Sequence, residues 1–293
     1  MRARWLCGLA LTLAPACGTP APTARDKVAE ARQALAEGSP KRALPLVADE
    51  AAGPGLVLRV RAQIGTQEWG SVPSLVAKVP AGADKDGLAC LLAAARTDVD
   101  AVQRCESAAR ATFEDPVLGD EVRTALAAAY ETEHRPDAAE QALRALVSAR
   151  PTRPNRKALV DFFDRQGFVK DGVESLEAWV ASDPEDPTIK ARLGQMLERK
   201  VRGDLLDKRY AEAEAAARRL LVVVPSRGEI RYYLADALAK QGKADEAAAE
   251  RKKAVDAHIK EPPPVDSFPG MQPPPDALTK PATGAPGSVA TPP

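Results

Sequence analysis

Residues Leu126–Pro151 read LAAAYETEHRPDAAEQALRALVSARP, and Leu159–Pro184 read LVDFFDRQGFVKDGVESLEAWVASDP. The second stretch repeats the pattern of the first at a distance of 33 residues. The matching positions are Leu126, Tyr130, Ala139, Leu143, Leu146 and Pro151, followed by Leu159, Phe163, Gly172, Leu176, Trp179 and Pro184. A fixed period of this length indicates stacked units, each of which buries its apolar face against the next.

The pattern continues toward the C-terminus. In Glu229–Ile259 the step from Leu234 to the small residue Ala247 equals the step from Leu126 to Ala139. One more unit lies between the second and third copies, but it is seven residues too long, and register places the excess within Glu198–Arg209. Seven residues make about two helical turns, so the addition can lengthen one or both helices without rotating their buried faces.

Small residues recur where two antiparallel helices of one unit would approach each other closely. They are Ala127, Ala139, Gly194, Ala213, Ala235 and Ala247. Pro151, Pro184 and Pro225 stop the second helices, while Gly167 and Gly242 suit the turn between two helices. At these positions the chain resembles the tetratricopeptide repeat (TPR), a helical hairpin of about 34 residues. The resemblance covers Asp120–Ile259 and implies an all-α fold, an α-solenoid of antiparallel hairpins.

A weaker form of the pattern extends toward the N-terminus and ends at Asp115-Pro116. The candidate helix pairs are Val28–Ala36 with Lys41–Ala51, Leu56–Gly65 with Val72–Val79, and Leu88–Ala95 with Val99–Phe113. We therefore predict six or seven pairs, in a degenerate part at residues 24–116 and a regular part at residues 117–260. A generic helical bundle is the alternative for the first part, because scattered Pro and Gly blur its period.

The composition excludes several classes of protein. Aromatic residues make up 4% of the chain, which disfavours an all-β fold, and 41 basic and 41 acidic residues cancel to zero net charge. Without a net positive field, nucleic acid is not an expected partner. Residues 261–293 contain eleven prolines and are predicted to be a disordered tail that packs no core. Such a tail could be a polyproline ligand, a spacer or a solvated terminus.

The first residues predict export. Arg2 and Arg4 precede the short apolar stretch Trp5–Ala14, as in a signal peptide of residues 1–16. Ala14-Pro15-Ala16-Cys17 fits both an ordinary signal-peptidase site and a bacterial lipobox. A lipidated Cys17, followed by a tether at residues 17–23, would anchor the chain by lipid to the periplasmic face of the bacterial outer membrane. The alternative is a soluble periplasmic or secreted protein.

Cysteine arithmetic favours the anchor. Cleavage removes Cys7 and leaves three cysteines, so lipidation of Cys17 leaves the even pair Cys90 and Cys105. These two could form a disulfide across the third helix pair, or they could be two buried free thiols in an apolar layer. The sequence leaves both states open.

The sequence contains none of the usual signatures of an enzyme, a metal site or a cofactor site. The two histidines, His134 and His258, lie in a turn and near a helix end, so we expect no catalytic residues, no metal and no cofactor. The resemblance to TPR proteins implies instead a concave groove for a protein or peptide partner. By register the groove residues are Lys157, Asp161, Arg165, Ala191, Gln195, Arg199, Tyr232, Asp236 and Lys240. Acidic groove positions argue against a clamp for a C-terminal carboxylate.

These observations predict a non-catalytic scaffold or adaptor lipoprotein that binds protein partners in the bacterial cell envelope. Its layout is similar to that of pilotin lipoproteins and other TPR lipoproteins of envelope assembly. A regulator or accessory subunit of a cell-wall or secretion enzyme, soluble in the periplasm, is the alternative. The sequence does not indicate the oligomeric state.

Overall fold

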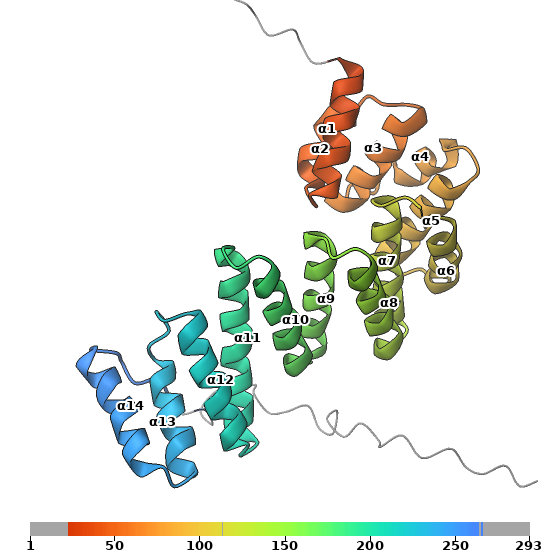
Figure 1. Ribbon diagram of the computed structural model, residues 1–293. Helices are drawn as coiled ribbons and strands as arrows, with labels where there is room; N and C mark the ends of the chain where they lie inside the picture. The colour runs from red at the N-terminus through yellow and green to blue at the C-terminus, as the bar shows by residue number, and fades with distance from the viewer. Residues whose placement is uncertain (1–22, 113, 264, 266–293) are drawn as a thin grey trace, which may run out of the picture. The chain divides into compact units, whose positions relative to one another are not determined.

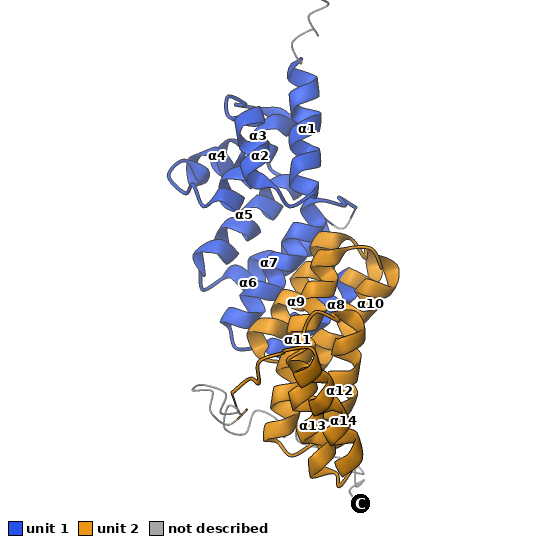
Figure 2. Cartoon of the chain, turned by 90° about the vertical axis from the view of Figure 1, so that its left-hand side faces the viewer, with its two compact units in different colours: residues 1–146 blue, residues 147–293 orange. Residues whose placement is uncertain are grey.

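The computed structural model describes residues 23–112, 114–263 and 265. Signal peptide, Cys17 and all but the last residue of the tether lie outside these residues, as does the tail after Val265. Helices form the described chain, and their succession is shown in Figure 1. The chain divides into two compact units, residues 1–146 and residues 147–293, coloured separately in Figure 2. The boundary between the two units falls inside one helix. The predicted division at residue 116 separates degenerate from regular repeats, which is a different criterion, and it stays a prediction.

The described part of unit 1, residues 23–112 and 114–146, contains seven helices and most of an eighth. They are α1 (Ala24–Ala36), α2 (Pro40–Val47), α3 (Gly53–Thr66), α4 (Val72–Lys78), α5 (Ala83–Arg96), α6 (Ala101–Ala111), α7 (Leu118–Thr132) and α8 (Pro136–Ala149), which crosses the boundary. Unit 2 contains α9 (Arg153–Gln166), α10 (Val169–Ser182), α11 (Pro187–Leu206), α12 (Tyr210–Val223), α13 (Ile230–Lys240) and α14 (Ala244–Asp256). Sequential helices pack as antiparallel hairpins, which confirms the predicted all-α, TPR-like fold.

The same turn ends the first helix of every pair. One residue adopts a left-handed conformation, and the amide of the next residue donates back to a carbonyl five residues earlier, as in Arg135 N to Tyr130 O at 2.9 Å. The left-handed residues are Gly38, Gln67, Thr97, His134, Gly167, Lys208 and Gly242. This turn reverses the chain within two to five residues, so the second helix packs against the first.

The inserted residues lengthen the first helix of their pair. Helix α11 has 20 residues, whereas α9 has 14, and α12 keeps the 14 residues of α10. The predicted insertion therefore extends α11 alone. Its far end is fixed by Asp204, which is 2% exposed and accepts from Lys200 at 2.8 Å and Arg209 at 2.7 Å.

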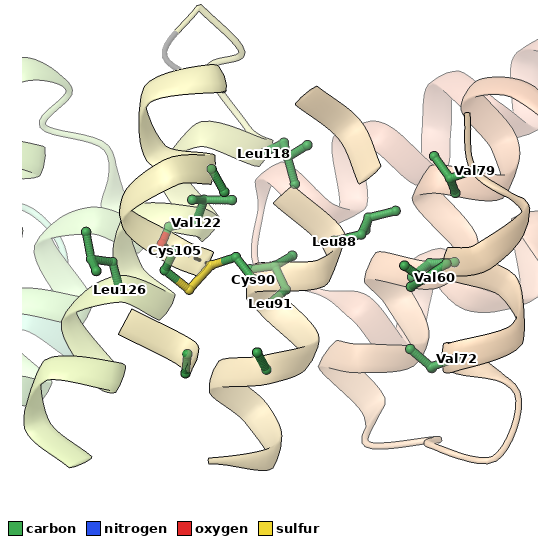
Figure 3. Close-up of a cluster of buried hydrophobic side chains, with 14 of the residues drawn as sticks. Val60, Val72, Val79, Leu88, Cys90, Leu91, Cys105, Leu118, Val122 and Leu126 are labelled. Atoms are coloured by element: carbon green, nitrogen blue, oxygen red, sulfur yellow. Dashed lines mark hydrogen bonds between the residues drawn. A yellow bond between two sulfur atoms is a disulfide. The ribbon is translucent and has the colours of Figure 1, made fainter. Parts of the chain in front are cut away.

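Apolar side chains between the helices form a separate core in each unit. In unit 1 the largest cluster joins α3 to α7 and includes Val60, Leu88 and Leu118 (Figure 3). Cys90 and Cys105 lie in this cluster, fully buried, and form a disulfide between α5 and α6. Of the two states that the sequence left open, the structure has the bonded one.

The core of unit 2 depends on small residues where the helices approach. Four of the predicted close-approach residues lie in this unit and are buried: Gly194, Ala213, Ala235 and Ala247. A Cβ added at Gly194 would lie 2.7 Å from Cγ2 of Val224. Val265, in the proline-rich tail, is half-buried against the same core. This tail residue therefore contacts a core that the preceding helices form.

Candidate protein-binding surface

Helix α9 presents three of the predicted groove residues. The helix begins at the Thr152 cap, whose hydroxyl accepts from the amide of Asn155, and it ends at the left-handed Gly167. Lys157, Asp161 and Arg165 follow one another at intervals of four, which places them on one face of the helix. Lys157 and Arg165 are exposed, and Asp161 is half-buried.

Asp161 is held by two cations. Its carboxylate accepts from Lys157 Nζ at 2.6 Å and from the guanidinium of Arg192, which belongs to α11. Burial alone would raise the pKa of Asp161, but the hydrogen bonds and charges of Lys157 and Arg192 outweigh it and hold the pKa below its ordinary value. The carboxylate therefore stays ionised at neutral pH and its charge is already balanced.

Helix α11 supplies the second row. Asp186 caps its start by accepting from the amides of Thr188 at 2.7 Å and Ile189 at 3.3 Å. Ala191 and Gln195 are exposed, and so is Arg199, which donates to Asp164 of α9. The pairs Asp161–Arg192 and Asp164–Arg199 thus bridge the two helices and fix the spacing of their exposed residues.

Arg192 and Asp164 were not among the predicted site residues. Each lies next to a predicted residue, Arg192 after Ala191 and Asp164 before Arg165. Register arguments select a helical face, but they do not show which long side chains reach across to the neighbouring helix. The only available signal was their opposite charge on adjacent first helices.

The predicted residues of α13 are engaged differently. Tyr232 is only 7% exposed, and its hydroxyl donates to the carbonyl of Ile259 at 3.0 Å. Asp236 accepts from Arg251 of α14, and Lys240 is exposed near the helix end. Two ion pairs, Asp161–Arg192 and Asp164–Arg199, therefore join α9 to α11 beside the predicted positions. We call the predicted residues of these two helices the α9–α11 surface: Lys157, Asp161, Arg165, Ala191, Gln195 and Arg199. The structure places Tyr232 under the chain that follows α14.

Neither a metal site nor a membrane-spanning helix is found in the described residues. Residues 23–112, 114–263 and 265 contain no group of three or more His, Cys, Asp or Glu side chains that could hold a metal ion. His134 occupies the turn after α7, and His258 the turn after α14. Within the same part of the chain, no helix has both the length and the apolar character needed to cross a bilayer.

Comparison with known proteins identifies part of this architecture. The tetratricopeptide repeat family model matches residues 208–262, which contain α12, α13 and α14. Among solved structures, the chain is similar to MamA (41-end) from Desulfovibrio magneticus RS-1, with 16% sequence identity and a TM-score of 0.35 over 60% of this chain and 94% of that chain. No curated protein matches the sequence.

The match shows a tetratricopeptide repeat at residues 208–262, in the part of the chain where the repeat pattern is regular. Stacked repeats of this kind present extended surfaces to other proteins, and they are typically non-catalytic. The repeat at residues 208–262 therefore suggests a protein-interaction scaffold.

Proposed function

We propose that the chain is a non-catalytic adaptor that binds an extended peptide or a partner helix on the α9–α11 surface. The observation that carries the proposal is the pair of bridges Asp161–Arg192 and Asp164–Arg199, which fix two first helices side by side. Side chains that are held before binding lose less conformational entropy when a partner arrives.

The charges of this surface define the kind of partner. Asp161 is neutralised by two cations, while Lys157, Gln195 and Arg199 remain exposed around it. A surface with basic and polar groups around a compensated acid suits a partner segment of mixed charge, with acidic residues opposite Lys157 and Arg199. It offers no uniform positive field to a polyanion.

A charge-reversal variant tests the proposal. Lys157→Glu with Gln195→Glu changes only exposed residues of the α9–α11 surface, and Lys170→Glu with Ala178→Glu is a matched control on exposed positions of α10. Proteins cross-linked to each chain in intact source cells are identified by mass spectrometry. We expect the first variant to lose partners that the wild type and the control retain, while unit 2 still melts in a cooperative transition, lowered only slightly by the loss of the exposed Lys157–Asp161 pair. Equal capture by all three chains would refute the role of this surface.

We further propose that the adaptor is a lipoprotein of the bacterial envelope, anchored through Cys17. The support is the sequence alone: the charged start, the apolar stretch Trp5–Ala14 and the small residues before Cys17, all outside the described residues. The full chain with Cys17→Ser should move from the membrane fraction to the soluble fraction of the cells. Continued membrane association of this variant would rule out the anchor, and it would leave the α9–α11 surface untouched.

A further inference from the structure

The chain reverses direction after α14. His258 adopts a left-handed conformation, and the amide of Ile259 donates to the carbonyl of Ala254 at 3.0 Å. This is the turn that ends first helices in the chain. By contrast, the second helices α10 and α12 end in extended residues, Asp183 and Val224. Instead of leading on to a further repeat, the turn sends the following residues back over α13.

Several contacts hold the returning residues, which we call the return segment (259–263 and 265). Ile259 lies against the turn before α13, where a Cβ added to Gly228 would be 2.2 Å from its Cδ1. Glu261 is 3.6 Å from Arg251, and Val265 is half-buried against the core of unit 2. The segment is therefore attached near its start, at Ile259 and Glu261, and at its described end, Val265.

Two tyrosines of α13 bond to the backbone of the return segment. The hydroxyl of Tyr232 donates to Ile259 O at 3.0 Å, and that of Tyr233 donates to Pro263 O at 3.4 Å. The guanidinium of Arg202, on α11, lies over the ring of Tyr233 at 5.6 Å. Tyr232, Tyr233 and Arg202 thus form a strip beneath the return segment, in which two buried tyrosines direct their hydroxyls at backbone carbonyls of that segment.

This strip has the chemistry that selects proline-rich chains. A run of prolines has no amide hydrogens to donate, so its backbone carbonyls are its only hydrogen-bonding groups, and its fixed φ lowers the entropy lost on binding. Aromatic surfaces with hydroxyl or indole donors bind such chains in other recognition modules. In this chain the return segment supplies two acceptors, Ile259 O and Pro263 O, and the aliphatic side chain of Val265.

We propose that the strip formed by Tyr232, Tyr233 and Arg202 is a recognition site for proline-rich extended peptides, and that the return segment is its resident ligand. This proposal rests on the proposed function in one respect only: both assign partner binding to the first helices of the repeats. Because the resident ligand directly follows α14, its effective concentration is of order millimolar. A competing peptide with a Kd near 0.1 mM is therefore weakened about tenfold by the resident segment.

The test compares variants of the full chain that differ in which proline run is altered. Pro262→Gly, Pro263→Gly and Val265→Asp together detach the return segment, and Pro273→Gly, Pro274→Gly and Ala277→Asp make the matched control in the second run. A milder variant carries only Pro262→Gly and Pro263→Gly. The probe is a fluorescein-labelled peptide of residues 261–267, EPPPVDS, titrated by fluorescence anisotropy, with a second peptide in which Pro262 and Pro263 are alanine. Circular dichroism establishes that all chains have the same helix content.

We expect the detached variant to bind the probe about ten times more tightly than the wild type and the control, and the milder variant to shift in the same direction. Adding Tyr233→Phe to the detached variant should weaken binding about fivefold, the cost of one hydrogen bond. Equal binding by detached and wild-type chains, no effect of Tyr233→Phe, or equal binding of the alanine peptide would each overturn the proposal. The Lys157→Glu and Gln195→Glu changes should leave probe binding unaltered, so failure of the α9–α11 surface is distinguishable from failure of this site.

Discussion

Reduction of the Cys90–Cys105 disulfide should destabilise unit 1 and leave unit 2 unchanged. The bond closes a loop with a sequence separation of 15 residues, and in the chain-entropy model a loop of this length contributes about 3 kcal/mol by restricting the unfolded chain. Both cysteines are fully buried in the cluster that joins α3 to α7, so reduction exchanges one S–S bond for two thiols without opening the core. The free energy of unfolding of unit 1 should therefore fall by about 3 kcal/mol, the value from the chain-entropy model.

For a unit of this size, each kcal/mol shifts the melting temperature by about 2–4 °C, so the transition of unit 1 should fall by about 6–12 °C. Differential scanning calorimetry with and without reductant measures this shift, and thiol counting under denaturing conditions verifies that the bond was open. A chain with Cys90→Ala and Cys105→Ala is the control, since its melting should not respond to reductant. If unit 1 melted within 2 °C of its oxidised value with both thiols free, the entropic reasoning would be refuted.

Two further predictions concern local interactions. Glu214 accepts from Lys243 at 2.7 Å, from Arg218 and from Gln241, and although burial opposes them these bonds lower its pKa to about 2. Because the pKa of Glu214 is lower in the folded chain than in the unfolded chain, its ionised form stabilises the folded state at pH values above about 4.5. This contribution is lost as the pH falls toward 2. Glu214→Gln should thus cost about 1 kcal/mol at pH 7, allowing for solvent screening, and nothing near pH 2; an equal cost at both pH values would contradict the linkage. Thr97 has a positive φ of 55°, which is strained for a β-branched residue, so Thr97→Gly should stabilise unit 1 by about 1 kcal/mol in thermal melting. A fall in melting temperature would show that Thr97 is not strained.

The helix pairs were predictable from the sequence because their positions are set by periodic apolar residues, small residues at close approaches and terminating prolines. The insertion was locatable for the same reason, since Phe163 and Leu197 keep one register and Ala213 and Ala247 keep another. Turns were less predictable. Gly167 and Gly242 signal a left-handed residue, whereas Lys208 fills the same position without any such signal and is held there by the packing of α11 against α12.

The candidate sites were only partly predictable, because their key contacts join residues that no periodic pattern relates. The register of Lys157 and Asp161 follows from helix geometry, but the bond from Arg192 to Asp161 depends on the reach of a long side chain between helices. Tyr232 occupies a groove position by register and is nevertheless buried, since the return segment covers it. A proline-rich composition predicts that the tail forms no core of its own. It does not predict whether a tail residue such as Val265 packs against the core of the preceding helices.

The insertion in α11 and the return segment are connected through the side chains of Arg202 and Tyr233. Arg202, which lies over Tyr233, falls within Glu198–Arg209, the stretch to which the seven extra residues map, so a repeat of ordinary length would end before this side chain. Glu198 pairs with Arg202 and also with Arg227, in the turn before α13. The longer α11 thus brings a charged network to the end of α13 that contacts the return segment. An extra two turns of helix are not needed to close a hairpin, and in this structure their side chains lie where the proline-rich segment binds.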